Sequence, residues 1–380
     1  MKRFIILIFV ILSLSSIYFC CEKKKEIKDN VTFDFGMVEK GREWLEYVES
    51  DAEEGAIRDY FMTQVAPTGG CQAIIHHWER FMKWNNDELY KFIMAALGKI
   101  PSEQKIRNPD GSLTIFGRRR QLWQEALMST DQMIKYLDVI KRTDFRESLR
   151  IAKTYLPSQA VLEADFYFVL FGHSLAFSVG KENGYDFLQL PRKKNGRIDI
   201  EQIIQIFAHE LHHTGFSFLA EQNQPIVQNE DRIYLLGILA SEGMPTYFID
   251  KPWQHLDFYR THEDFLYRML AEDWEKHSAN LDALYIEAEK DMALNLANNL
   301  NREGILKKWM SGIKGAAYVL GADMFSAIEN YLGREQALNV ALDYRQFLLL
   351  YNRAVDLAEK KGKMLFHFSP ELAKKISELE

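Results

Sequence analysis

Cysteine is scarce in this chain. Of 380 residues three are cysteine, and two of them, Cys20 and Cys21, stand at the end of an apolar leader. Cys71 is left for the rest of the sequence, which excludes an internal disulfide framework. The stability of the fold must therefore come from a hydrophobic core, and a hydrophobic content of 47% in a chain of this length can supply one.

Basic residues do not outnumber acidic ones: the chain has 47 Lys and Arg against 54 Asp and Glu. The formal net charge is −7. A protein that binds nucleic acid would be expected to carry a basic face that matches the phosphate backbone. We therefore expect no nucleic-acid partner.

An apolar run occurs at the N-terminus. Lys2 and Arg3 precede sixteen uncharged, mostly apolar residues. This run is short for a membrane-spanning helix, which needs about 20 residues. We predict a secretory signal over 1–21 and a polar tether over 22–35, with an uncleaved anchor as the alternative. The pair Cys20-Cys21 resembles the end of a bacterial lipoprotein signal, so we expect an exported protein held at a membrane, periplasmic or at the cell surface, by lipid on Cys20 or Cys21.

The pattern of apolar residues changes twice after the leader. Residues 36–157 repeat apolar side chains at helical spacing, which predicts a helical N-terminal region. Short aromatic and β-branched runs separated by glycine follow, and these are typical of strands. The predicted strands are Asp165–Phe171, Ser174–Val179 and Tyr185–Leu190. Helical spacing then returns, so we predict a second region over 158–358, a C-terminal tail or helix over 359–380, and an α+β fold that is predominantly helical with a small mixed sheet.

The stretch from Ile203 to Leu219 contains the pattern His-Glu-x-x-His, at His209, Glu210 and His213. On an α-helix the two histidines lie one turn apart on the same face, so both imidazoles can bind one zinc ion. Glu210 projects beside the pair, where a carboxylate can act as a general base toward water. We therefore predict Zn²⁺ as the cofactor, His209 and His213 as ligands, and Glu210 as a catalytic residue.

A third ligand must come from further along the chain. A third histidine six residues after His213 is excluded, because Leu219 occupies that position. A glutamate from a later helix is another known arrangement, and Glu242 lies in an otherwise apolar segment. A carboxylate buried there needs a cationic partner, so we predict Glu242 as the third ligand. Pro245 implies either a kinked helix or a helix that begins at Ser241.

Several short motifs carry a resemblance to a known family. They are His209-Glu-Leu-His-His213, Ser241-Glu-Gly-Met244 and Tyr318-Val-Leu-Gly321, followed by Met324 and Gly333. Over about residues 150–355 the chain resembles bacterial zinc-dependent peptidases grouped as a domain of unknown function, within the broader gluzincin group. The resemblance implies a zincin-like catalytic region at 158–358 and hydrolysis of peptide bonds.

A further catalytic residue is expected from the same resemblance. Gluzincins usually add a tyrosine or histidine that hydrogen-bonds the negative charge developing on the substrate. The candidates after Glu242 are Tyr247, His255, Tyr259, His262 and Tyr318. We select Tyr318, which stands shortly before Gly321 at the start of an apolar helix and belongs to the resemblance. A packed aromatic side chain is the alternative interpretation of this residue.

These features together favour a zinc-dependent metallopeptidase that acts on a peptide or protein substrate. One alternative is a non-catalytic exported lipoprotein whose zinc is structural and whose helices bind a partner. A closed structural site takes four ligands and needs no base, so Glu210 beside His209 favours the enzyme. Another alternative is a zinc hydrolase of a non-peptide substrate, which the sequence does not separate from a peptidase.

Overall fold

The computed structural model of the chain describes residues 29–380 except for positions 51, 83, 110, 112, 173–174, 194 and 263–264. The predicted signal at 1–21, with Cys20 and Cys21, lies outside the described residues. Among the helices of the described part, none is long and apolar enough to cross a membrane.

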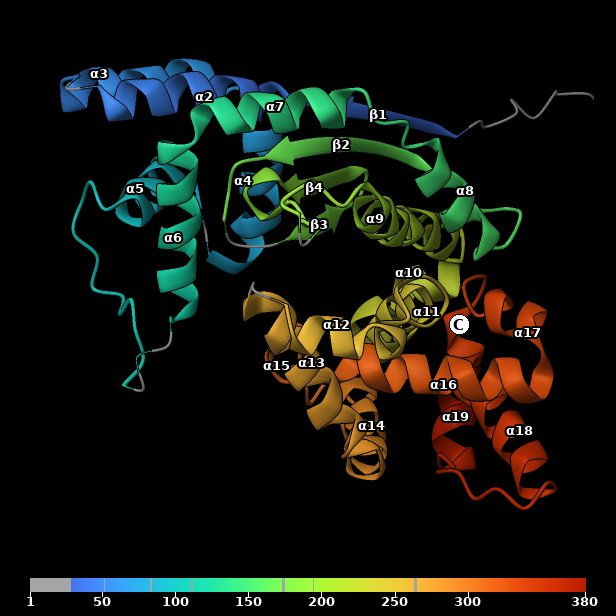
Figure 1. The fold of residues 1–380 in the computed structure, drawn as a ribbon. Helices are drawn as coiled ribbons and strands as arrows, with labels where there is room; N and C mark the ends of the chain where they lie inside the picture. Colours follow the sequence, from blue (N-terminus) through green and yellow to red (C-terminus); the bar gives the residue numbers. More distant parts are fainter. Residues whose placement is uncertain are drawn as a thin grey trace, which may run out of the picture.

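The described residues form a small mixed sheet surrounded by helices (Figure 1). Its strands are β1 (Asn30–Asp34), β2 (Glu163–Val169), β3 (Ala176–Val179) and β4 (Glu182–Asp186). Their order is β1-β2-β4-β3; β2 pairs in parallel with β1 and β4, whereas β3 runs antiparallel to β4 and forms an edge. The predicted α+β class, mostly helical with a small mixed sheet, is confirmed.

One part of the predicted tether is wrong. Residues 30–34 fall within the expected tether 22–35, yet they form strand β1. Phe33 lies opposite Phe166 of β2, and its ring also stacks on Phe207 with centroids 6.0 Å apart. Partial burial of this aromatic side chain against the core fixes the segment in place, because apolar area removed from water is the main favourable term in folding.

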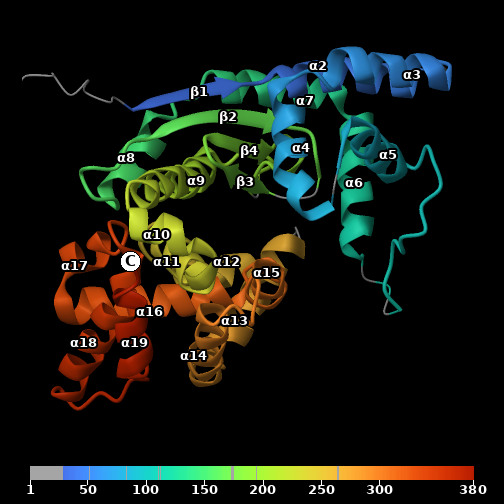
Figure 2. The ribbon, with the colours of Figure 1, turned by 180° about the vertical axis from the view of Figure 1, so that it is seen from behind.

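The N-terminal region is helical between β1 and β2 (Figure 2). Its helices are α2 (Gly36–Glu49), α3 (Glu54–Tyr60), α4 (Gly69–Met82), α5 (Asn86–Leu97), α6 (Ile115–Met128), α7 (Thr130–Lys141) and α8 (Arg146–Thr154), with a π-helix, η1 (Phe61–Val65), between α3 and α4. Local signals set their ends: the side chain of Asn85 accepts the N–H of Glu88 at the start of α5, and Gly98, at φ 78°, closes that helix.

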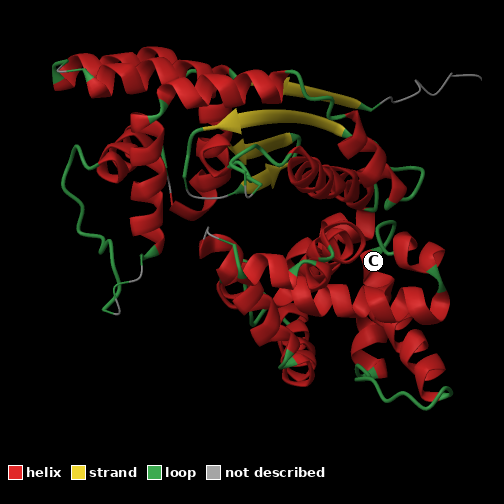
Figure 3. Ribbon diagram, viewed as in Figure 1, coloured by secondary structure: helices red, strands yellow, loops and turns green. Residues whose placement is uncertain are grey.

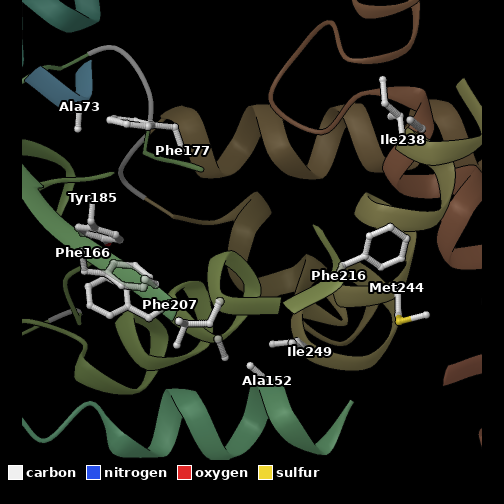
Figure 4. Close-up of a cluster of buried hydrophobic side chains, with 14 of the residues drawn as sticks. Ala73, Ala152, Phe166, Phe177, Tyr185, Phe207, Phe216, Ile238, Met244 and Ile249 are labelled. Carbon is white, nitrogen blue, oxygen red and sulfur yellow. The ribbon is translucent and has the colours of Figure 1, made fainter. Parts of the chain in front are cut away.

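Helix α9 (Ile200–Glu221) lies against the sheet through an aromatic cluster (Figure 4). The ring of Phe207 stacks on Phe166 at 4.6 Å and meets Tyr185 edge-on at 5.2 Å. Successive strand residues point to opposite faces, so Tyr167 and Val169 of β2 pack instead against the glycines that begin α4. The sheet therefore holds α9 on one face and α4 on the other.

The C-terminal half is almost entirely helical (Figure 3). Its α-helices are α10 (Gln224–Asn229), α11 (Tyr234–Pro245), α12 (Leu256–Arg260), α13 (Phe265–Ser278), α14 (Leu281–Leu296), α15 (Arg302–Trp309), α16 (Ala316–Leu332), α17 (Arg334–Asn339), α18 (Phe347–Glu359) and α19 (Pro370–Ser377). Short turns join them: the 3₁₀ segments η3 (Glu230–Ile233), η5 (Pro252–Gln254) and η6 (Tyr344–Gln346), and the π-helix η4 (Thr246–Asp250). A further 3₁₀ segment, η2 (Phe187–Gln189), lies between β4 and α9. One cluster of buried side chains runs from Met37 to Ile376, so both halves share a core.

Helices α11 and α16 cross so closely that their backbones touch. A Cβ on Gly243 would lie 2.5 Å from the Cα of Gly321, and a Cβ on Gly321 would collide with the carbonyl oxygen of Leu239. Glycine is required at both positions because no side chain fits between the helices. The crossing lies next to Glu242 and one turn after Tyr318, so it sets how near these two residues come.

We expect Gly321→Ala to lower the free energy of unfolding by about 1–3 kcal/mol, because the added methyl group forces α11 and α16 apart. Zinc affinity should fall as well, since Glu242 moves with α11. Gly55→Ala is the matched control: Gly55 lies in α3 with nothing within 4 Å of its missing Cβ, so the change should be neutral or stabilising. Urea unfolding and zinc titration measure both effects, and a Gly321→Ala protein as stable as the control variant would contradict the argument.

Candidate metal centre

The two histidines of the His-Glu-x-x-His motif lie on the same face of α9. Their ring centroids are 4.7 Å apart, with the ring planes at 74°. The Nε2 atom of each points toward one carboxylate oxygen, Oε2 of Glu242, at 3.6 Å from His209 and 3.4 Å from His213. Helix α11 thus brings Glu242 to the histidines, as the sequence predicted.

This arrangement fits a zinc ion. Two atoms bound to zinc at about 2.0–2.1 Å in tetrahedral geometry lie about 3.3–3.4 Å apart, which is close to the separations between Glu242 Oε2 and the imidazole nitrogens. Oε2 of Glu242 is also a buried atom without a hydrogen-bond partner. A buried carboxylate oxygen left without a hydrogen bond is costly, and a metal shared with His209 and His213 removes that cost. One donor atom from each of the three residues lies within 4.8 Å of the others.

Of the two alternatives that Pro245 suggested, a helix that begins at Ser241 is wrong. Helix α11 begins at Tyr234, so Glu242 lies well inside it. Pro245 is the last α-helical residue, and the chain continues as the π-helix η4. Proline cannot donate a backbone hydrogen bond, and single π-turns occur often at functional sites. The π-turn closes with the N–H of Lys251 donating to Thr246.

The π-turn positions Asp250, a residue that sequence reasoning missed. Oδ1 of Asp250 lies 3.0 Å from Nδ1 of His209. When Nδ1 carries the proton and donates it to Asp250, the lone pair of Nε2 is left for the metal, as in many metal sites. The other oxygen, Oδ2, accepts a hydrogen bond from Nζ of Lys314 at 2.9 Å.

The titratable groups of the site shift one another's pKa values. Burial alone would lower the pKa of His209, but the carboxylate of Asp250 outweighs it and raises that pKa to about 10. For Glu242 burial would raise the pKa, but the imidazoles of His213 and His209 hold it well below its usual range. An imidazole bound to metal must be neutral, so zinc binding at His209 releases a proton.

Glu210 and Tyr318 line a cleft together with the three metal-binding candidates. The cleft has a volume of about 710 Å³, and the edge strand β3 lies along it beside α9. Burial raises the pKa of Glu210 above its usual value. Burial and the nearby carboxylates of Glu242 and Glu210 raise the pKa of Tyr318 well above its usual value, so its hydroxyl stays protonated and can donate a hydrogen bond.

The other tyrosines and histidines near the motif have different surroundings. Tyr247 donates its hydroxyl to Glu329 at 2.7 Å. His212 is fully buried with Nε2 at 3.1 Å from the carbonyl oxygen of Tyr155, and burial lowers its pKa to about 3. Of the five residues considered for binding the developing negative charge, Tyr318 is the one that lines the cleft.

The model of the family described as "Putative zinc dependent peptidase (DUF5700)" matches residues 64–360, a span that contains His209, His213 and Glu242. No curated protein and no solved structure matches significantly. The family description agrees with the ligand group, which places three donors around one point. Because the matched residues make up most of the sequence, the chain belongs to this zinc-dependent family.

Proposed function

We propose that the protein is a metallopeptidase of the gluzincin type that hydrolyses peptide bonds. The observation that carries the proposal is a group of three ligands, two histidines and Glu242, with Glu210 beside it in an open cleft. His209, His213 and Glu242 would hold the zinc, and bound zinc lowers the pKa of water and polarises a carbonyl group.

The roles of the protein's own groups follow from their places in the cleft. Glu210 accepts a proton from the attacking water and later donates it to the nitrogen of the leaving amine, so the proton is conserved over the reaction. Asp250 holds His209 in the tautomer that leaves Nε2 free. The same residues cannot form a closed structural site from the ligands described, because such a site takes four and this group supplies three.

The edge strand β3 supports a peptide as the substrate. Ala176, Phe177 and Ser178 of β3 line the cleft that contains the metal-binding candidates. An extended peptide can add to the edge of a sheet through main-chain hydrogen bonds, with its side chains in pockets on either side. Such binding would place a peptide bond between β3 and α11, opposite Glu242.

A mixed peptide library tests the substrate class. The purified full chain, loaded with zinc, should cleave some members of the library, and a chelator should stop the cleavage until zinc is restored. Mass spectrometry of the products would locate the bonds that are cut. A zinc-loaded protein that leaves every peptide intact would rule out a general peptidase. The alternative of a zinc hydrolase that acts on a non-peptide substrate would then be favoured.

Tyr318 is proposed to hydrogen-bond the negative charge that develops on the carbonyl oxygen. We expect Tyr318→Phe to reduce kcat by about 10²–10³-fold, because loss of one such donor typically costs that much. Tyr60→Phe, which removes a hydroxyl bound to Glu43 at 2.6 Å in the N-terminal region, is the matched control and should keep full activity. Steady-state kinetics on both variants gives the comparison, and a folded Tyr318→Phe protein with wild-type kcat would reject the role.

A further inference from the structure

Lys314 places a positive charge behind the metal-binding group. It lies in the segment between α15 and α16, and its side chain is 14% exposed. Its Nζ atom is 2.9 Å from Oδ2 of Asp250 and 4.4 Å from the centroid of the Tyr318 ring. One ammonium group therefore contacts both the carboxylate that orients His209 and the aromatic ring proposed to assist the reaction.

The backbone at Lys314 is held in place by the carboxylate of Asp273. Oδ2 of Asp273, on α13, accepts the N–H of Ile313 at 2.7 Å and the N–H of Lys314 at 3.3 Å. Gly312 adopts φ 95°, and a Cβ at this position would lie only 2.6 Å from the same oxygen. The segment can approach Asp273 only with glycine here. The position of Lys314 is thus set by α13 and by the turn, independently of the metal-binding residues.

The ammonium group gives Asp250 a second partner. Both carboxylate oxygens of Asp250 lie 3.0 Å from Nδ1 of His209, and Oδ2 also accepts a hydrogen bond from Lys314. A carboxylate held from two sides has one preferred orientation, whereas a neutral side chain at position 314 would remove the ammonium group that holds Oδ2 in this enclosed site. The carboxylate could then turn away from His209. Partners that orient a ligand in this way typically change metal affinity by about 10–100-fold.

We propose that Lys314 is a positioning residue that fixes the metal ligand His209, through Asp250, and the ring of Tyr318 in one arrangement. The effect on His209 concerns metal binding alone and does not require hydrolysis. The effect on Tyr318 rests on the proposed function. A single residue in the turn before α16 would thus couple metal affinity to turnover, although it lies 105 residues after His209.

Zinc affinity of the full chain tests the first effect without any substrate. In competition with a chromophoric chelator, Lys314→Met should weaken zinc binding about 10–100-fold. Lys314→Arg should restore most of the affinity, because it returns a cation to Asp250. The matched control is Lys308→Met: Lys308 pairs with Glu287 and Asp291 at 2.7 and 2.6 Å, so its loss should reduce stability but leave zinc affinity unchanged.

Two further measurements keep the test decisive. Replacing zinc by Co²⁺ gives an absorption spectrum that reports ligand geometry, and we expect it to change in Lys314→Met but not in Lys308→Met. If Lys314→Met does not fold, Asp273→Ala serves instead and should weaken zinc binding, because it removes the oxygen that holds the backbone of Ile313 and Lys314. Zinc affinity equal to that of the wild type in the folded variant would overturn the proposal.

Turnover tests the second effect separately. With a cleaved peptide and saturating zinc, Lys314→Met should lower kcat more than it changes KM, because Tyr318 is expected to act after the substrate is bound. Wild-type kcat at full zinc occupancy would overturn this part. If the wild-type protein cleaves no peptide, the proposed function fails, while the affinity comparison at His209 still stands or falls by itself.

Discussion

In the Glu210→Gln protein we expect hydrolysis to fall about 10²–10⁴-fold, which is the usual contribution of a positioned general base. Glutamine keeps the shape of the side chain but cannot accept the proton from water. Zinc content should stay at the wild-type level, since Glu210 is absent from the ligand group of His209, His213 and Glu242. The melting temperature should hardly change for the same reason.

The control for this variant is Glu201→Gln, in the exposed first turn of the same helix. It makes the same change of carboxylate to amide away from the cleft, so its activity should equal that of the wild type. Zinc analysis, thermal unfolding and peptide hydrolysis on the two variants separate chemistry from structure. A zinc-loaded Glu210→Gln protein that cleaves at the wild-type rate would remove the general base from the mechanism and favour a zinc-binding scaffold.

The three candidate ligands could be predicted because each follows from a local rule. A helix of 3.6 residues per turn brings residues four apart onto one face, which fixes His209 and His213 without knowledge of the fold. Glu242 could be found because a carboxylate in an apolar segment needs a partner. In the structure its Oε2 lies 3.6 Å from Nε2 of His209 and 3.4 Å from Nε2 of His213.

Asp250 and Lys314 could not be found in the same way. Asp250 follows Pro245 through a π-turn, and this turn breaks the period by which helical neighbours are recognised. Lys314 lies in an irregular segment, and its contact with Asp250 spans 64 residues. Long-range contacts of this kind leave no periodic signal in the sequence. The signal that remained was an acidic residue directly after the apolar Phe248-Ile249.

Strand β1 was missed for a related reason. Besides Asn30, two of its five residues, Thr32 and Asp34, are polar or charged, and the strand lies inside the polar stretch 22–35 that was predicted as a tether. Its partner β2 runs parallel to it, with Asn30 opposite Glu163, and all helices from α2 to α8 lie between the two strands in the sequence. Parallel pairing requires such a crossover connection. A hairpin can be recognised from its short turn motif, but a crossover has no such motif.

The second large effect is expected from His213→Ala, which deletes a metal ligand. Zinc should be lost, and hydrolysis with it, because Glu210 then has no activated water from which to take a proton. Stability should also fall, since a metal that binds only the folded state stabilises it by about 2.7 kcal/mol at a concentration of 100 Kd. The melting temperature of His213→Ala should therefore no longer rise when zinc is added.

The control for this variant is His212→Ala, at the neighbouring position in the same helix. His212→Ala removes a buried imidazole that binds the carbonyl oxygen of Tyr155 at 3.1 Å, so it should cost about 1–3 kcal/mol of stability. Because His212 lies outside the ligand group, its variant should still bind zinc and should still gain melting temperature from it. A rise of equal size in His213→Ala and His212→Ala would mean that zinc binds elsewhere, and the metal centre described here would be wrong.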